Sequence, residues 1–383
     1  MSTTLRTGIL FLLLAPPASA QIDFGVSGYA VNFPIYQRIN PTLAGLFGIE
    51  EHQFVDVTRI RIRPSAGLWS DAFLMLEYEI NATYFSSPLP FPVTSTRSSG
   101  QVFDLTWNPI SEARWNLVHF IDRLYLKQIT DILDLTVGRQ RISWGTGRVW
   151  NPTDLFNPIN PTSFAKVEKD GVDAILAKFI LGNFTDLSVV MNPRDKWEGS
   201  NFGARFRSNI DGFDVSLMGG SFDKRRVLGI DFAGSILDAG IRGEAIVSRI
   251  DRTGESSFVK YILGVDNQFT EEFYALAEYH YNGQGKTHPQ EYDVFALQQG
   301  LLLNLGKQFV ALQGTYLIHP LVSAVAGYTR SVTDGSGFII GTVSYSATGT
   351  ATLSLGGQIF HGDEFEEFWY YPTSAYFRLE YFF

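Results

Sequence analysis

The sequence predicts an all-β chain that folds as a transmembrane antiparallel β-barrel of about 18 strands. From residue 22 onward, short segments alternate between apolar and polar residues, which is the period of a β-strand. No uninterrupted apolar run is long enough to form a transmembrane helix. The last ten residues, SAYFRLEYFF, place five apolar side chains on one face and Arg378 and Glu380 on the other. This segregation suits a strand with lipid on one side and water on the other.

The first 20 residues are predicted to be a cleaved signal peptide. Arg6 is followed by the apolar run GILFLLL at 8–14, and Ala18-Ser19-Ala20 has the small residues of a cleavage site. The apolar run is too short to cross a bilayer as a helix. We therefore expect an exported chain with one domain, an outer-membrane β-barrel at 21–383.

The composition excludes several classes of function. The chain has no cysteine, which excludes metal–thiolate sites, thiol nucleophiles and disulfides. Its formal net charge of −9 argues against binding to nucleic acid. No histidine cluster has metal-ligand spacing. We expect no metal site, no cofactor and no nucleic-acid partner.

Eighteen strands are predicted by alternation and turn residues, with 16 as the alternative count. The parity rule for bacterial barrels decides in favour of an even number. Pro34 is expected to end the first strand, and 290–303 is expected to be helical or irregular. The predicted strands are 22–33, 55–68, 72–84, 118–127, 131–142, 173–181, 184–191, 201–208, 213–219, 227–234, 241–249, 258–267, 272–281, 309–317, 321–330, 338–345, 351–360 and 374–383.

Charged residues alternate along the predicted hairpin at 55–84. A turn centred on Ser70 would place Arg63 opposite Glu77 and Arg61 opposite Glu79, where opposite charges attract across the strands. Arg59 shares the face of Arg61 and Arg63. The alternative is a solvated face of a soluble sheet, on which such ion pairs contribute little stability.

Two arginines pose a problem for the strand at 131–142. Arg139 and Arg141 share the parity of the apolar residues Leu133, Leu135 and Val137, and arginine facing mid-membrane lipid is costly. We therefore predict a β-bulge at or near Gly138 that turns both arginines to the interior.

The connection at 144–172 is long and rich in proline, asparagine and glycine. By its place after the fifth strand it is similar to the loop of general porins that folds back into the lumen. We expect it to form a constriction. The tryptophans of this loop would either stack on sugars or anchor it to the wall. The candidate residues of this loop are Trp144, Arg148, Trp150, Asp154, Glu168 and Asp170.

The C-terminal strand resembles that of Gram-negative outer-membrane β-barrels, in which the terminal aromatic residue is read by the assembly machinery. This resemblance implies an outer-membrane location, contact with membrane lipid, and recognition of Phe383 by the barrel-assembly machinery. The segment LTVGRQRISW at 135–144, with DRLYL at 122–126, looks like a hairpin of porin-like barrels, including the alginate-export family. That family has a basic pore, to which Arg139 and Arg141 would correspond.

These observations favour a porin that passes small hydrophilic solutes by passive diffusion. The pore-lining candidates for selectivity are Arg59, Arg61, Arg63, Glu77, Glu79, Arg139, Arg141, Arg205 and Arg207. A guanidinium keeps its charge in a narrow lumen, and rings of charge select ions. Arginine and glutamate on neighbouring strands could equally serve only to stiffen the wall.

A non-conducting structural or surface-interaction barrel with a filled lumen is the alternative function. An enzyme is not expected, because none of the six histidines lies in a catalytic motif. His280 in particular is expected to be a wall residue. The sequence leaves the oligomeric state open.

Overall fold

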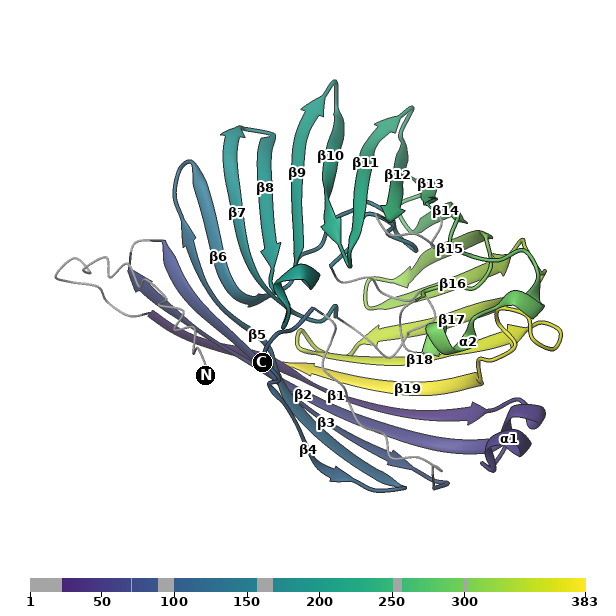
Figure 1. Ribbon diagram of the computed structural model, residues 1–383. Helices are drawn as coiled ribbons and strands as arrows, with labels where there is room; N and C mark the ends of the chain where they lie inside the picture. Colours follow the sequence, from purple (N-terminus) through teal and green to yellow (C-terminus); the bar gives the residue numbers. More distant parts are fainter. Residues whose placement is uncertain (1–22, 70, 89–99, 157–167, 251–256, 299–301) are drawn as a thin grey trace, which may run out of the picture.

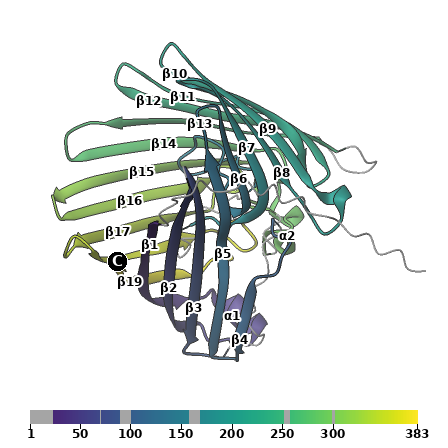
Figure 2. The same cartoon turned by 90° about the vertical axis from the view of Figure 1, so that its left-hand side faces the viewer.

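A computed structural model describes residues 23–69, 71–88, 100–156, 168–250, 257–298 and 302–383. The predicted signal peptide lies outside these residues. Within them, 18 strands form a closed antiparallel ring in which each strand pairs with its neighbour along the chain, and β19 pairs with β1 (Figure 1). Closure removes the unpaired sheet edges that a membrane would leave without hydrogen-bond partners. Figure 2 shows β1, β2, β3 and β5 side by side in the wall.

The first half of the chain supplies ten strands, of which β4 is not a full member of the ring. β4 pairs only with the first part of β5, while β3 pairs directly with β5. These strands are β1 (Asp23–Arg38), β2 (His52–Trp69), β3 (Ala72–Phe85), β4 (Thr106–Ser111), β5 (Trp115–Ile129), β6 (Leu133–Gln140), β7 (Val172–Gly182), β8 (Thr185–Asn192), β9 (Asn201–Ile210) and β10 (Phe213–Phe222).

The second half of the chain completes the ring. Its strands are β11 (Arg225–Ile236), β12 (Ala239–Ile250), β13 (Phe258–Gln268), β14 (Phe273–Asn282), β15 (Gln308–His319), β16 (Val322–Ser331), β17 (Gly337–Ser346), β18 (Ala351–His361) and β19 (Thr373–Phe382). The helical pieces are α1 (Pro41–Phe47), α2 (Val294–Gln298), η1 (Trp197–Gly199) and η2 (Pro289–Glu291). No described helix has both the length and the apolar character needed to cross a membrane.

Each of the 18 predicted strands overlaps one strand of the ring, so the predicted count is confirmed. The connections at the end that holds the chain termini are tight turns, such as 211–212 and 237–238. The opposite end carries the long connections, including 141–171 and 283–307. We call it the loop end. In bacterial barrels the short turns are periplasmic and the long loops are extracellular.

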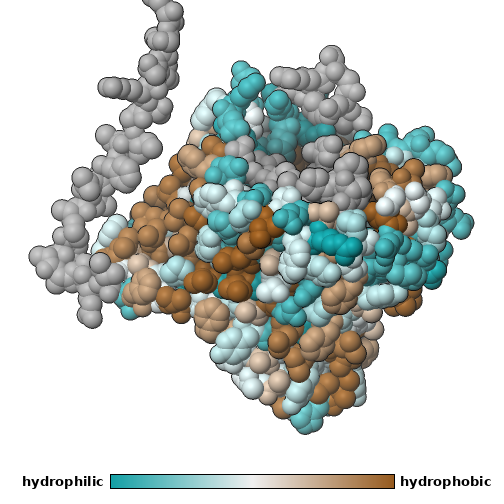
Figure 3. Space-filling view, turned by 90° about the horizontal axis from the view of Figure 1, so that it is seen from below, coloured by the Kyte–Doolittle hydropathy of each residue, from teal (hydrophilic) through white to brown (hydrophobic). Residues whose placement is uncertain are grey.

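The two faces of the wall differ in polarity, as a membrane barrel requires. On β13, Leu263 is 56% exposed on the outer face, whereas its neighbour Ile262 is 0% exposed and faces the interior. Large apolar residues recur on the outer face of most strands, and Figure 3 shows them spread over one side of the molecule. Buried carboxylates, amides and hydroxyls line the inner face. This segregation is that of a membrane-spanning barrel.

The predicted register of the β2–β3 hairpin is confirmed, since Arg61 pairs with Glu79. The prediction that Pro34 ends the first strand is wrong. β1 pairs with β2 continuously through Pro34, but its pairing with β19 skips Phe33 and Pro34. Proline has no N–H to donate, so the strand tolerates it where one neighbour is left unpaired. The sequence analysis also missed α1 and β4, which lie in stretches read as irregular.

The predicted bulge at Gly138 is also wrong. β6 keeps one register with β5 and with β7 across Gly138. The register shift lies in the β3–β5 pairing, where Asp122 is the extra residue. Arg139 is nevertheless kept from lipid, since it is buried and bonds to Asp173 and to the carbonyl oxygen of Ile121. Arg141 follows the end of β6 and is exposed.

The membrane face yields a direct test. Replacing Leu263 with arginine places a charge on the lipid side of the middle of β13, which should cost about 2–4 kcal/mol of folding free energy. The matched control is Leu237→Arg, because Leu237 is 95% exposed in the β11–β12 turn and the same charge there should cost little. Denaturant unfolding in lipid vesicles measures both; equal effects would contradict the assignment of the membrane face.

Candidate functional site

The described parts of the β6–β7 connection, 141–156 and 168–171, lie inside the barrel along its inner wall. Trp144 packs edge-on against Phe222 of β10, with ring centroids 6.3 Å apart. Six residues later, Trp150 stacks on His280 of β14 at 5.3 Å and contacts Phe309 of β15 at 5.9 Å. The segment therefore runs past the inner faces of β10 to β15. We call these described residues, 141–156 and 168–171, the constriction loop, after the constriction that the sequence predicts.

Two acidic residues of the wall hold this loop by its backbone. Glu278 of β14 accepts hydrogen bonds from the N–H groups of Arg148 (2.8 Å), Val149 (3.2 Å) and Trp150 (2.7 Å). Both carboxylate oxygens are thereby engaged, Oε2 by Arg148 and Oε1 by Val149 and Trp150. Three successive amides that point at one carboxylate require a tight local turn of the loop backbone.

Glu244 of β12 holds the segments on either side of that turn. It accepts N–H groups of Thr146 (2.5 Å), Gly147 (2.6 Å) and Thr153 (3.0 Å), and the hydroxyl of Thr153 (2.7 Å). Both carboxylates are almost fully buried, at 3% exposure for Glu244 and 2% for Glu278. Hydrogen bonds to a charged acceptor contribute about 1.5–3 kcal/mol each, more than neutral ones. These hydrogen bonds fix the position of the loop against the inner wall.

Gly147 is needed where the loop passes closest to the wall. A Cβ at this position would overlap the carbonyl oxygen of Trp150 and press on the side chain of Ile262. A larger residue would therefore push the loop away from Glu244 and Glu278.

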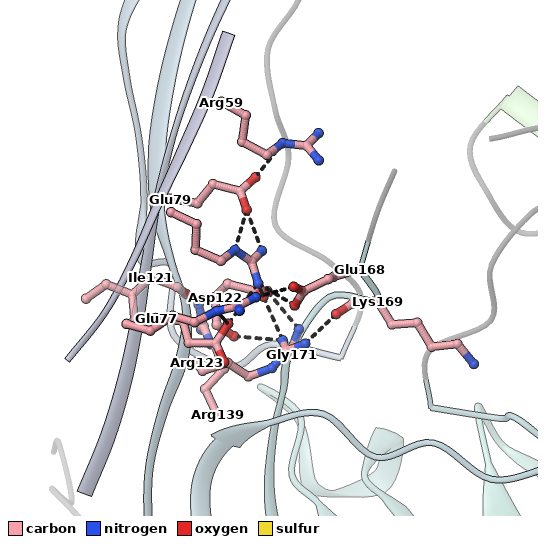
Figure 4. A network of polar contacts seen from close by, with 12 residues as sticks. Arg59, Glu77, Glu79, Ile121, Asp122, Arg123, Arg139, Glu168, Lys169 and Gly171 are labelled. Carbon is pink, nitrogen blue, oxygen red and sulfur yellow. Dashed lines mark hydrogen bonds and ion pairs between the residues drawn. The ribbon is translucent and has the colours of Figure 1, made fainter. Parts of the chain in front are cut away.

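The other end of the constriction loop meets β2 through Glu168 (Figure 4). Arg61 binds Glu168 and Glu77 at 2.8 Å each, Asp122 at 3.0 Å, and Glu79 at 2.6 Å. Arg61 is only 4% exposed and pairs with carboxylates from two strands, β3 and β5, and from the loop. The oxygens of Glu77, Asp122 and Glu168 come together closely enough to bind a metal ion. The positively charged guanidinium of Arg61 contacts all three and supplies the balancing charge instead.

The neighbouring charges complete a balanced network. Arg63 pairs with Glu168 and with Glu77 (3.3 Å), Arg59 with Glu79 (3.2 Å), and Arg123 with Asp122 (2.8 Å). Its four arginines, Arg59, Arg61, Arg63 and Arg123, face the four carboxylates Glu77, Glu79, Asp122 and Glu168, so the formal charge is 4 − 4 = 0.

The other predicted arginines of the wall also have acidic partners. Arg139 lies 2.8 Å from Asp173, Arg205 lies 3.0 Å from Asp231, and Arg207 lies 2.7 Å from Asp186.

The remaining predicted loop residues are Asp154, Asp170 and Arg148. Asp154 pairs with Lys169, which closes the base of the loop, and Asp170 follows beside it, partly buried. Arg148 differs from the wall arginines because its side chain is exposed and makes no ion pair within the described residues. The structure places His280 in the wall, stacked on Trp150, with Nδ1 3.2 Å from the carbonyl oxygen of Tyr261.

Glu244, Glu278 and Asp122 are not among the site residues predicted from the sequence. The available signal was a single acid at an inward-facing position within an otherwise apolar strand, as in GEAIV and LAEYH. Burying a carboxylate is costly unless hydrogen bonds compensate it, so such an acid indicates a partner inside the barrel.

The anchors of the constriction loop can be tested separately. Glu278→Ala removes the acceptor for three amides, and hydrogen exchange at 148–150 should become at least tenfold faster. Each broken charge-assisted bond is worth about 1.5–3 kcal/mol. Glu272→Ala, at an exposed acid in the turn just before the same strand, is the control. Unchanged protection at 148–150 would contradict the anchoring role.

The charge network gives a second test. Arg61→Ala leaves buried carboxylates without their shared cation and should destabilise the barrel by about 3–5 kcal/mol. Arg141→Ala, at an exposed position, should change stability by less than about 0.5 kcal/mol. The denaturant concentration at the midpoint of unfolding is measured for both variants. Equal midpoints would show that the charge network around Arg61 does not stabilise the barrel.

No protein-family model matches the chain, and no curated protein sequence matches it. Solved structures do match over nearly its whole length. The chain is similar to OccK5 (OpdH) of Pseudomonas aeruginosa, with 9% identity, a TM-score of 0.57, and coverage of 94% of this chain and 98% of that one. A BenF-like porin from Pseudomonas fluorescens Pf-5 gives 10% identity, a TM-score of 0.58, and coverage of 94% and 98%.

OccD3 (OpdP) of Pseudomonas aeruginosa gives 10% identity, a TM-score of 0.55, and coverage of 94% and 91%. At this identity the likeness establishes the fold. The apolar outer belt agrees with the same outer-membrane setting. The ring of strands, the apolar belt and these matches together show that the chain is a membrane-spanning β-barrel with the fold of these porins.

Proposed function

We propose that the protein is a porin that lets small hydrophilic solutes cross the outer membrane by passive diffusion. The anchoring of the constriction loop by Glu244 and Glu278 carries this proposal. A loop that is drawn into the lumen and fixed by seven hydrogen bonds to two wall carboxylates sets a constant cross-section. Size exclusion at this constriction is the mechanism, and Phe383 is the signal that the assembly machinery recognises.

The interior arginines shape the selectivity of the channel. Arg59, Arg61 and Arg63 face acids of the wall and of the constriction loop, so their main effect is a transverse field rather than a net charge. The exposed side chain of Arg148, on the part of the loop that Glu278 holds, adds an uncompensated positive charge. A narrow passage with such a charge prefers anions.

A filled, non-conducting barrel is the second candidate. Packed apolar clusters inside the barrel favour it, because the constriction loop contributes Trp144, Phe156 and Trp150 to them. The two candidates differ in whether a continuous aqueous path remains beside the loop.

Single-channel conductance in a planar bilayer with a salt gradient tests the proposal. Stable open steps with an anion-biased reversal potential are expected, and Arg148→Gln should reduce the bias while Arg141→Gln changes it less. Glu244→Ala/Glu278→Ala, which frees the loop, should alter the conductance and raise its noise. No conductance from folded, inserted protein would favour the filled barrel.

A further inference from the structure

Three neighbouring strands, β16 to β18, present no charged side chain to the interior (Figure 1). On β17, Phe338 is buried while Ile339 is 51% exposed, so the even-numbered positions face inward. The directly opposite residues of β16 and β18 share that face. The three strands are described throughout, and Arg330, their one charged residue, points outward. We call their inward-facing residues, odd-numbered on β16 and even-numbered on β17 and β18, the neutral wall.

Hydroxyl groups replace charges on the neutral wall. Ser344 and Ser354 lie directly opposite each other, with their Oγ atoms 2.9 Å apart. Ser323 of β16 is opposite Ser344 and extends the row. Two hydroxyl groups have two protons between them, and the bond from one serine to the other uses one. The pair therefore keeps one donor and several acceptor lone pairs for a solute in the lumen.

Tyr376 of β19 lies along the neutral wall. Its hydroxyl is 2.6 Å from Oγ1 of Thr342 on β17, so the side chain reaches across β18. It passes over Gly356, where a Cβ would lie 2.6 Å from its Oη and 2.7 Å from its Cζ. One side of the ring is thus against the wall, and the other is toward the interior. The tryptophans of the constriction loop, Trp144 and Trp150, are buried instead.

Two polar groups beside Tyr376 have open hydrogen-bonding capacity. Ser374 of β19 and Gln358 of β18 lie directly opposite each other and are 5% and 3% exposed. Oγ of Ser374 and Oε1 of Gln358 make no hydrogen bond. A polar group that is buried without a partner is destabilising, so these two atoms gain most from a partner that a solute brings.

The charge on β19 favours a neutral solute. Its two charged residues, Arg378 and Glu380, pair with each other at 2.5 Å. Arg378 is opposite Ser354, at the edge of the neutral wall. An anionic solute on this wall would lose water without gaining a cation that is not already paired, which is costly. A neutral solute with hydroxyl groups avoids that cost.

We propose that Tyr376 and the neutral wall bind one ring of a neutral sugar. The C–H face of the sugar packs on the aromatic ring, and its hydroxyls exchange hydrogen bonds with Ser344, Ser354 and Gln358. Sugar hydroxyls both donate and accept, as the groups of the wall do. The proposal rests on the channel function above and names neutral carbohydrates as a substrate class. Ion preference, set at Arg148, and sugar binding are separate properties of the same lumen.

Saturation-transfer NMR on the folded protein in deuterated detergent micelles tests the site without relying on conductance. D-Glucose is the probe, and the aromatic protons of the protein are irradiated, so the signal reports sugar C–H groups next to an aromatic ring. Tyr376→Ala should weaken glucose binding at least about fivefold. Tyr376→Phe keeps the ring and should retain most of the binding. Tyr381→Ala, which removes a ring from the lipid side of the same strand, should behave as wild type.

The hydroxyl row and the charge preference are tested in the same experiment. Ser344→Ala should weaken glucose binding about threefold, since it removes one neutral hydrogen-bonding group. Ser188→Ala is the matched control, because Ser188 is an inward-facing, partly exposed serine on β8 beside Asp186. D-Glucuronate has the same ring with a carboxylate and should bind more weakly than glucose.

No transfer to glucose in wild-type protein, or equal transfer in wild type and Tyr376→Ala, would overturn the sugar site. Where Tyr376→Ala does not fold, equal glucose affinity of Ser344→Ala and Ser188→Ala would overturn it. Tighter binding of glucuronate than of glucose, lost in Tyr376→Ala, would overturn the neutral class. Glucose binding by inserted protein that does not conduct would sink the channel function and leave the site, and conductance without glucose binding would do the reverse.

Discussion

The structure depends on carboxylates that are buried inside the wall and bonded to the backbone of its loops. A loop inside a barrel must satisfy amides that water would otherwise solvate, and a wall acid must be compensated for its burial. Glu244 and Glu278 meet both requirements at once for the constriction loop. Glu367 does the same between the connections at the loop end. Each bond joins chain segments that the strand ladder does not connect.

The same logic governs the arginines of the wall. A guanidinium offers five donors in a fixed plane, and Arg61 uses them on carboxylates from β3, from β5 and from the constriction loop. The wall therefore gains rigidity from charges that cancel. In the proposed channel, selectivity would therefore depend on the few charges outside such pairs, such as Arg148 of the loop, more than on the paired arginines of the wall.

Alternation of apolar and polar residues predicted all 18 strands of the ring, because one face of each strand meets lipid and the other does not. It also predicted the register that joins Arg61 to Glu79. It placed the bulge wrongly: β6 keeps one register across Gly138, and the extra residue is Asp122 of β5, about which the alternation along β6 carries no information. The roles of Glu244 and Glu278 depend on where a distant loop folds, which strand periodicity does not encode.

Pro34 has a mechanical consequence. β1 is bonded to β2 along its length, but its ladder to β19 is interrupted at Phe33 and Pro34. The first and last strands of the barrel are thus joined by an interrupted ladder of hydrogen bonds. On its other side, β1 is joined to β2 by an uninterrupted ladder. A force that separates the first and last strands would part them there, so the barrel should unzip at its own point of closure and peel strand by strand from β19.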